Sequence, residues 1–482
     1  MPFGFNHELV ILISRSALWS FFSEIKLEGI ENIPPESQPF IIAATHHNMI
    51  LDPAVLSVTF PNKRRLHYWA KNTMFKNSYV ARFLSDCGVV PVDRTTKNNA
   101  HLYAATFEVL KLGEAVAVFP EGTSHTLPQL SKFKDGASFA ALEYAKINQE
   151  EGLHKYAPIL PVGIVYPEKS KYRSNVIVKY GKPIYVEQLL PLYLEDPKKA
   201  AKELTKLLEE SIEQLTVNAP NWDSKYAADM ARWLLFPGEQ HRLVSDYVPI
   251  TQSLITYKLE LESLLLKDTQ IAKYNEKNIT AITTTIDLLK QTVASLIDLP
   301  LFLPGLIAHL PLYIAGHLAG HFEIYEEVRA QNKIFLGLAF VPIIYLIAFI
   351  WGWYSLFGGT ILGFINSIAT LGIFVWYHVT SIDERYRNFK DLLGRWRLFD
   401  AVVLGRGMWK RKERIFELKK LRTENVTMLR KMILKYEGED KDINYIMVAL
   451  RQRAMNQLVN TTTSNKFMMK KKTIAKQYEW LL

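Results

Sequence analysis

The stretch Pro39–Pro53, PFIIAATHHNMILDP, places two histidines directly after an apolar run that ends at Ala44. The run Phe40–Ala44 is short and lies between polar residues, so it predicts a buried strand. Pro53 suits the first position of a helix, and Asp52 suits the cap that precedes it. The stretch therefore predicts a strand, a short polar turn and a helix, as expected in an α/β domain.

The same alternation extends over residues 24–190. Further short apolar runs predict strands at residues 66–70, 89–92, 115–119, 159–165 and 176–180. Helix-like segments such as Asn98–Leu112 and Gly136–Ala145 lie between several of them. A charged amphipathic helix at Lys198–Leu215 follows the last strand. We therefore expect an α/β fold, a layered sheet with flanking helices.

His47 and Asp52 stand five residues apart and form a candidate catalytic pair. On a continuous helix their side chains would point about 140° apart. A turn before Pro53 can instead fold the His47 ring back toward Asp52. One carboxylate oxygen would then cap the helix while the other holds an imidazole N–H. The second ring nitrogen is left to take a proton from a hydroxyl group. A plain helix cap at Asp52 is the alternative.

Two later blocks also place polar residues at predicted strand ends. Cys87-Gly-Val-Val-Pro-Val-Asp-Arg-Thr95 puts Arg94 where a guanidinium could grip a phosphate, or make a surface ion pair. After Phe119-Pro120, the four residues Glu121, Gly122, Thr123 and Ser124 form a polar turn. The backbone N–H groups of such a turn suit anions or substrate hydroxyls. An ordinary strand-to-helix loop is the alternative there.

Residues 334–382 contain no Asp, Glu, Lys or Arg, which predicts a hydrophobic hairpin. Two helices of about 20 residues would each cross a bilayer, with Gly358-Gly359 as the turn. A buried soluble hairpin is the alternative. The preceding uncharged segment, residues 299–322, carries Pro300, Pro304 and Pro311. Because proline interrupts helices, we expect a re-entrant or interfacial segment there.

The chain carries a formal net charge of +10, and its C-terminal part supplies the excess. Residues 383–482 hold 24 Lys and Arg against 12 Asp and Glu. This balance favours anionic partners such as lipid head groups; a solvated helical face is the alternative. No recognised nucleic-acid-binding module occurs, so we expect no nucleic-acid partner. Basic residues flank the hairpin on both sides, so both ends should face the cytosol.

The N-terminal residues 1–23 predict an amphipathic helix, associated with a membrane or packed on the domain. No basic segment precedes the apolar residues 9–13, so a cleaved signal peptide is not expected. The single cysteine, Cys87, rules out an intrachain disulfide and fits a reducing compartment. We expect six regions: 1–23, the α/β domain 24–220, a helical region 221–298, the Pro-rich segment 299–322, the hairpin 334–380 and the tail 383–482.

Four blocks in this order resemble the glycerolipid acyltransferase superfamily. They are His47-x-x-x-x-Asp52, Gly88–Arg94, Phe119-Pro-Glu-Gly-Thr123 and the apolar Ala157–Gly163. The fungal-type glycerol-3-phosphate/dihydroxyacetone-phosphate acyltransferases are the most similar subgroup. That similarity rests on Phe119–His125 followed by Lys134–Ala137, on Thr216–Pro220 before the Pro-rich segment, and on the C-terminal hairpin.

The resemblance implies that His47 is the general base and Asp52 its orienting partner. It implies that Arg94, neighbouring backbone and Lys134 hold the acceptor phosphate, and that Glu121 and Gly122 shape the acceptor site. Acyl-CoA would be the co-substrate, with no other cofactor. The expected reaction is acyl transfer to the sn-1 hydroxyl of glycerol-3-phosphate, or of dihydroxyacetone phosphate, at the endoplasmic reticulum membrane. Many members have Asn where this chain has His46, which leaves His46 without an implied role.

Three other interpretations remain open. The acceptor could be a lysophospholipid such as 1-acylglycerol-3-phosphate, which also bears a phosphate and a free hydroxyl. The chain could be a membrane scaffold with an inactive acyltransferase domain. A metal could bind at His46, His47 and Asp52, or at His309, His317 and His321, but neither set forms a recognised motif, so we expect no metal.

Overall fold

The computed structural model describes residues 3–92, 103–153, 155–236, 247–256 and 281–404, with scattered helical residues between 423 and 452. The chain divides into two compact units. The first unit comprises Met1–Thr216 and Phe302–Asp383, and the second comprises Val217–Leu301 and Glu384–Leu482. The α/β domain and the apolar hairpin therefore belong to the same unit.

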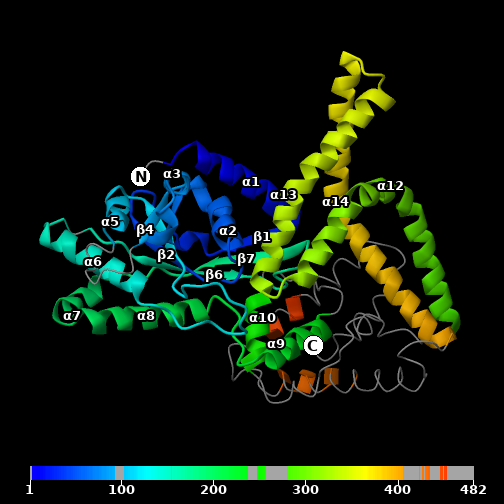
Figure 1. Ribbon diagram of the computed structural model, residues 1–482. Helices are drawn as coiled ribbons and strands as arrows, with labels where there is room; N and C mark the ends of the chain where they lie inside the picture. Colours follow the sequence, from blue (N-terminus) through cyan, green and yellow to red (C-terminus); the bar gives the residue numbers. More distant parts are fainter. Residues whose placement is uncertain are drawn as a thin grey trace. The chain divides into compact units, whose positions relative to one another are not determined.

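A seven-stranded mixed sheet organises the first unit (Figure 1). Its strands are β1 (Phe22–Glu28), β2 (Phe40–Ala44), β3 (Leu66–Lys71), β4 (Val89–Val92), β5 (Ala115–Val118), β6 (Ile159–Val165) and β7 (Ser174–Tyr180). Their order across the sheet is β1-β7-β6-β2-β5-β3-β4. Strands β6, β2, β5, β3 and β4 run parallel, whereas β7 is antiparallel to β6 and pairs in parallel with β1. Strand β2 thus lies at the centre, between β6 and β5.

Helices cover both faces of this sheet. The side chains of β2 point alternately to the two faces and are therefore buried on both sides. Ile41 and Ala43 pack in a core with α5, α6, α7 and α8. Phe40, Ile42 and Ala44 pack in a second core with α1, α2 and the start of α13. The helices of the domain are α1 (Phe5–Phe21), α2 (Leu51–Thr59), α3 (Ser78–Asp86), α5 (Ala104–Lys111), α6 (Gly136–Glu150), α7 (Leu190–Glu195) and α8 (Pro197–Glu213). Short 3-10 turns occur at Ile30–Asn32, Pro61–Lys63, Asn72–Phe75 and Glu187–Leu189.

The predicted α/β class is confirmed, and all six apolar runs are strands. Strand β1 was not predicted, because its residues alternate between apolar side chains and Glu24, Lys26 and Glu28. This strand lies at an edge of the sheet, where one face needs no apolar partner. The N-terminal helix was predicted to extend to residue 23, but α1 ends at Phe21 and Phe22 begins the strand.

Two apolar helices form the hairpin, at the predicted place. They are α13 (Glu326–Trp351), extended by a π-helical turn at Gly352–Leu356, and α14 (Ile361–Phe399). Gly358 and Gly359 both adopt positive φ angles, 66° and 68°, and make the turn. Two spans, Glu326–Leu356 and Ile361–Ile382, are long and apolar enough to cross a membrane. Only 6% and 17% of their most apolar windows are buried, which argues against a buried soluble hairpin.

The Pro-rich segment, residues 299–322, is helical in spite of its prolines. It forms the second half of one continuous helix, α12 (Ala281–Phe322). Pro300, Pro304 and Pro311 are four and seven residues apart, so they fall on nearly the same face of the helix. The backbone hydrogen bonds that they remove therefore lie along one side, and the other side keeps its ladder. How this segment meets a membrane stays a prediction.

The second unit has a helical core of its own. Helices α9 (Trp222–Leu235) and α10 (Tyr247–Thr256) pack with Leu429, Ile433, Ile446, Met447 and Leu450. A π-helical turn at Asp400–Leu404 follows α14. Most of the basic tail after this turn, including the clusters at 409–412 and 468–472, lies outside the described residues, as does Arg94.

Helix α2, which carries Asp52, is anchored through Leu56, whose side chain is 0% exposed. We expect Leu56→Ala to lower the free energy of unfolding by about 2–5 kcal/mol, because it leaves a cavity between helix and sheet. Leu207→Ala is the matched control, since Leu207 is also helical but 42% exposed, and should change it by about 0.5 kcal/mol or less. Denaturant unfolding of both variants in detergent measures the difference; equal losses would contradict this packing.

Candidate active site

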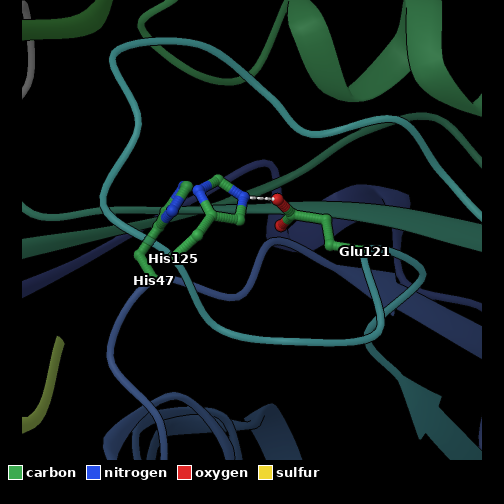
Figure 2. Close-up of side chains that lie close together, drawn as sticks. All are labelled: His47, Glu121 and His125. Atoms are coloured by element: carbon green, nitrogen blue, oxygen red, sulfur yellow. Dashed lines mark hydrogen bonds and ion pairs between the residues drawn. The ribbon is translucent and has the colours of Figure 1, made fainter. Parts of the chain in front are cut away.

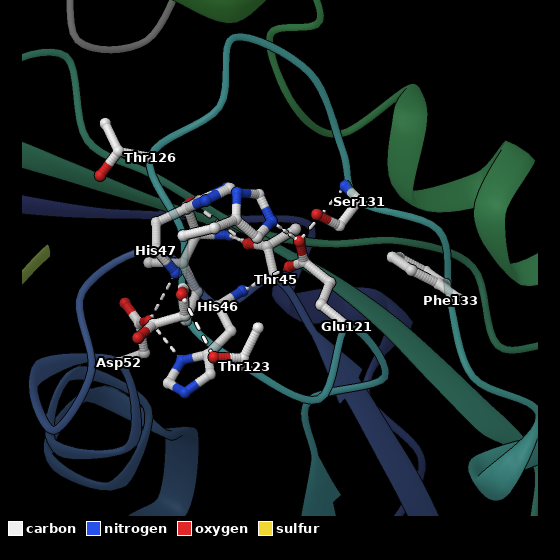
Figure 3. A network of polar contacts seen from close by, with 12 residues as sticks. Thr45, His46, His47, Asp52, Glu121, Thr123, Thr126, Ser131 and Phe133 are labelled. Carbon is white, nitrogen blue, oxygen red and sulfur yellow. Dashed lines mark hydrogen bonds and ion pairs between the residues drawn. The ribbon is translucent and has the colours of Figure 1, made fainter.

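Three neighbouring strands end at the same edge of the sheet and bring their following loops together. Strands β2, β5 and β6 are parallel, with β2 in the middle. The loop after β2 carries His46 and His47, the loop after β5 carries Glu121 and His125, and the chain after β6 carries Tyr166. A hydrogen bond from the backbone N–H of His46 to Glu121 joins the first two of these loops (Figure 3). The carboxyl ends of the central strands therefore form the candidate site.

The carboxylate of Asp52 pairs with the ring of His46, not with that of His47. Nδ1 of His46 lies 2.8 Å from Oδ2 of Asp52. His47 reaches the same oxygen only with its backbone N–H, also at 2.8 Å. The predicted contact between the His47 imidazole and Asp52 is therefore wrong. The dashed lines that converge on Asp52 in Figure 3 include both of these interactions.

The shape of the turn explains this pairing. Asp52 was expected to be the helix cap. It is instead the second residue of α2, which begins at Leu51. Met49 adopts a positive φ of 39°, so the chain reverses sharply just before the helix. The Asp52 carboxylate then faces back toward the strand end and receives the backbone N–H groups of His47 and Asn48, each at 2.8 Å. With its backbone turned toward Asp52, His47 directs its ring elsewhere.

Asp52 is fully buried, with 0% of its surface exposed, yet its oxygens have four hydrogen-bond donors. Besides the three groups of the turn, the hydroxyl of Tyr166 donates to Oδ1 at 2.7 Å. Burial and the neighbouring Asp52 charge raise the pKa of the Tyr166 hydroxyl well above its usual value. The tyrosine therefore keeps its proton and remains a donor at neutral pH.

His46 is the imidazole that is oriented for proton transfer. Because an ionised carboxylate only accepts hydrogen bonds, Nδ1 of His46 carries the proton and Nε2 keeps its lone pair. The ring stacks on Phe119, with centroids 4.2 Å apart and planes at 19°. Its side chain is 18% exposed, so a small molecule can approach it. Such a His–carboxylate pair can act as a general base toward a hydroxyl group.

Glu121 ties the loop after β5 to the loop after β2. Its side chain is fully buried, and Oε1 accepts the backbone N–H of His46 at 2.7 Å. Oε2 accepts a hydrogen bond from Nε2 of His125 (Figure 2). The backbone N–H of His125 donates in turn to the carbonyl of His46, at 3.3 Å. Glu121 thus fixes the backbone that carries His46.

His47 lies on the other side of the turn, against His125. The two rings meet edge to face, with centroids 5.3 Å apart at 87° (Figure 2). Burial lowers the pKa of His47, although Glu121 and Asp52 oppose this effect, so its ring is neutral at physiological pH. His47, Glu121 and His125 place one ligand atom each within 4.8 Å of one another and could hold a metal ion. Both Glu121 oxygens already accept hydrogen bonds, so we do not propose a metal there.

The remaining residues of the predicted acceptor site line the loop after β5. Gly122 has a φ of 78°, and a methyl group built on it would lie 2.3 Å from Nζ of Lys134. The Lys134 ammonium therefore rests on this turn, next to the exposed Thr123 and the half-buried Ser124. Backbone and ammonium together offer donors to an anion. Arg94 cannot be added to this group, because it lies outside the described residues.

Three residues of the site were not predicted from the sequence: His125, Tyr166 and Lys169. Each follows an apolar strand by at most seven residues, which is the signal that could have found them. Lys169 donates to the backbone carbonyl of His47 at 3.0 Å and to the hydroxyl of Thr126 at 2.5 Å. These residues come from loops whose proximity depends on the order of the strands, which the sequence pattern alone does not give.

Comparison with known proteins places this site in a family. Residues 24–165 match the family model described as Acyltransferase. Glycerol-3-phosphate O-acyltransferase 2 of Saccharomyces cerevisiae is 24% identical over 282 residues, which cover 52% of this chain and 37% of the yeast protein. A chloroplastic 1-acyl-sn-glycerol-3-phosphate acyltransferase of Arabidopsis thaliana is 27% identical, over 38% of this chain and 49% of its own length.

Among solved structures, the 1-acyl-sn-glycerophosphate (LPA) acyltransferase from Thermotoga maritima is 21% identical, with a TM-score of 0.32. That match covers 43% of this chain and 78% of the bacterial one. The chain thus spans less than half of the yeast and plant relatives that it matches. The family match includes the loops that carry His46, Asp52 and Glu121. Residues 24–165 of this chain therefore form a domain of the acyltransferase family.

Proposed function

We propose that this chain transfers a fatty acyl group from acyl-CoA to the sn-1 hydroxyl of glycerol-3-phosphate, with dihydroxyacetone phosphate as a further acceptor. The observation that carries the proposal is the His46–Asp52 pair at the carboxyl end of the central strand. Support for the acceptor comes from the name of the yeast relative. The product would be lysophosphatidic acid, an intermediate of phospholipid synthesis.

The reaction needs one proton carrier and no covalent intermediate on the enzyme. Nε2 of His46 takes the proton of the acceptor hydroxyl while its oxygen attacks the thioester carbonyl of acyl-CoA. The tetrahedral intermediate collapses, the carbon–sulfur bond breaks, and the imidazolium returns the proton to the departing thiolate. Asp52 holds the ring in one tautomer and offsets its transient positive charge. The oxygen–carbon ester bond that forms replaces the thioester bond that breaks.

His46 is preferred over His47 as the base because two carboxylates hold it. Its ring donates to Asp52 and its backbone N–H donates to Glu121. A base fixed at both points keeps its lone pair aimed in one direction. The ring of His47 packs edge-on against His125 instead. The catalytic roles of His47 and His46 are thus exchanged relative to the motif spacing, while Asp52 keeps its role as the orienting partner.

The acceptor phosphate would bind beside this pair. Thr123 and Ser124 would supply backbone N–H groups, whereas the N–H of Gly122 already donates to the carbonyl of Phe119. The Lys134 ammonium lies against Gly122. Arg94 completes the phosphate site in this proposal, as the family resemblance implies. When the acceptor phosphate is held on this turn, the acceptor hydroxyl would reach His46, because Glu121 of the same turn is hydrogen-bonded to the His46 backbone.

We further propose that the chain is an integral protein of the endoplasmic reticulum membrane, with the catalytic domain and basic tail in the cytosol. Two helices are long and apolar enough to span a bilayer. Arg329 and Lys333 precede the apolar core of the hairpin, and Arg385, Arg387 and Lys390 follow it. Positive charge at both ends favours the cytosolic side for each. Membrane lipids are therefore its expected surroundings.

A second candidate acceptor is 1-acylglycerol-3-phosphate, because the plant relative is named for that substrate. It bears the same phosphate and a free hydroxyl, so the same base and the same turn would serve it. A non-catalytic scaffold is less well supported, since His46, Asp52 and Glu121 are buried together at one strand edge.

Purified full-length protein in detergent, supplied with labelled acyl-CoA and one acceptor at a time, tests the proposed acceptor. We expect glycerol-3-phosphate to be acylated with the highest kcat/KM, followed by dihydroxyacetone phosphate. Acylation of 1-acylglycerol-3-phosphate alone would contradict the proposal and favour the second candidate. Rescue of the cellular function by the Asp52→Asn protein as fully as by the wild type would support a scaffold.

Matched substitutions of the two histidines test which ring is the base. His46→Gln should lower kcat about 10²–10⁴-fold, the usual contribution of a general base. Asp52→Asn should lower it by a similar factor, since it loses the carboxylate that fixes the tautomer. His47→Gln should have a smaller effect, because His47 binds Asp52 only through its backbone. Active His46→Gln with inactive His47→Gln, in steady-state assays of equally folded proteins, would return the base to His47.

A further inference from the structure

The ammonium of Lys169 joins the two loops that carry the site histidines. Its Nζ donates to the carbonyl of His47 at 3.0 Å and to the carbonyl of His125 at 3.4 Å. It also donates to Oγ1 of Thr126, at 2.5 Å. The carbonyl of Lys169 accepts from the side chain of Asn48 at 3.4 Å. Lys169 thus bridges the loops after β2 and β5 from the loop after β6.

The three donors of this ammonium are all in use. A lysine side chain has three N–H groups, and Lys169 has three oxygen partners. Burial lowers the pKa of Lys169, but the carboxylates of Glu326 and Glu327 oppose this effect. A cation whose donors are already satisfied by protein oxygens has none to spare for a substrate phosphate. Its contacts therefore favour a role in holding the loops.

The first turns of α13 are packed into the same unit, next to these loops. Ala330 is 0% exposed and Ile334 7% exposed, and both belong to the core beneath β2 and α2. Nζ of Lys333 donates to the carbonyl of Ser170 at 2.7 Å, one residue from Lys169. The helix that continues into the candidate membrane span is thus fixed to the acyltransferase domain at its N-terminal end.

A polar chain runs from this helix to the site. Glu327, in the first turn of α13, accepts a hydrogen bond from the hydroxyl of Thr126 at 2.7 Å. The same hydroxyl oxygen accepts from Lys169, which holds the carbonyl of His47. The peptide group beyond that carbonyl supplies the Asn48 N–H that bonds Asp52. The path therefore ends on the carboxylate that orients His46.

We propose that Lys169 and Glu327 are positioning residues, through which the first turn of the membrane-hairpin helix α13 fixes the backbone beside the catalytic pair. This inference rests on the proposed acyl transfer at His46. A shift of the His47–Asn48 backbone would move Asp52 and turn the imidazole away from the acceptor hydroxyl. A misplacement of about 1 Å can cost on the order of 100-fold in rate. The seating of the hairpin helix thereby becomes a condition for catalysis.

The first experiment compares Lys169→Met with Lys171→Met in the full chain in detergent. Lys171 is the matched control, because among the residues that the structure describes its side chain pairs only with Glu168. Lys169→Met should lower kcat about 10–100-fold with little change in either KM. Hydrogen exchange at the amides of residues 46–48 should become faster, since their loop loses its bridge. The control should leave kcat, KM and exchange as in the wild type.

The second experiment uses Glu327, which lies outside the substrate loops and is only partly buried. Glu327→Leu removes the acceptor for Thr126 and should lower kcat and speed exchange at residues 46–48. Glu327→Gln keeps an acceptor oxygen, so its kcat and its exchange at residues 46–48 should both stay close to those of the wild type. The double variant Lys169→Met/Glu327→Leu should be no worse than Lys169→Met, because both act along one path.

Three results would overturn the proposal. One is a raised KM for the acceptor with unchanged kcat in Lys169→Met, which would make Lys169 a phosphate ligand. Another is unchanged exchange at residues 46–48 in Lys169→Met. The third is equal loss in Glu327→Gln and Glu327→Leu. If the wild type acylates no acceptor, the proposed function fails, and exchange in the Lys169 and Glu327 variants still decides whether the path holds the loop.

Discussion

The site depends on the hydrogen bonds that the buried carboxylate of Asp52 accepts. This carboxylate accepts hydrogen bonds from the His46 ring, from two backbone N–H groups and from the Tyr166 hydroxyl. A charged group with no exposed surface is tolerated only when such donors replace water. Each hydrogen bond to a charged group contributes about 1.5–3 kcal/mol. The carboxylate therefore fixes the strand end, the turn and the chain after β6 in one arrangement.

A second buried carboxylate, Glu121, completes this arrangement from the neighbouring strand. It accepts the backbone N–H of His46, so that His46, alone among the described residues, is hydrogen-bonded to both acids. The sheet makes this possible, because β2 and β5 are adjacent and parallel and end at the same edge. The oriented imidazole is thus a product of two loops, each of which follows a buried apolar strand. Neither loop alone would hold the ring in a single direction.

Much of the domain could be predicted from the sequence because its central strands β2, β5 and β6 are buried on both faces. The runs Phe40–Ala44, Val89–Val92 and Ile159–Val165 coincide with observed strands. The edge strand Phe22–Glu28 was missed, since its polar alternate residues weaken the apolar signal. The prolines of α12 lie nearly on one face of a helix that continues through them, and the predicted re-entrant or interfacial character of this segment stays a prediction. The hairpin helices were predicted by length and by the absence of charge.

The candidate site was predicted in its residue types but not in its pairing. Motif spacing favoured His47 because five residues separate it from Asp52, yet the ring contact comes from His46, six residues away. The turn at Met49, which has a positive φ, determines which ring meets Asp52. A methionine in the sequence does not predict such a turn. Lys169 and Glu327 are separated from His46 and His47 by more than 100 residues, so only the packed structure brings them to the same loops.

The sequence by itself determined the α/β class, the acyltransferase-like order of blocks, the apolar hairpin and the acidic and histidine residues of the site. These features depend on local composition and periodicity, which a chain carries before it folds. The tertiary structure decided which histidine meets Asp52, how Glu121 joins two loops, and that the first turn of α13 reaches the site. These depend on strand order and on one sharp turn, because hydrogen bonds between distant loops form only when the sheet sets their distance.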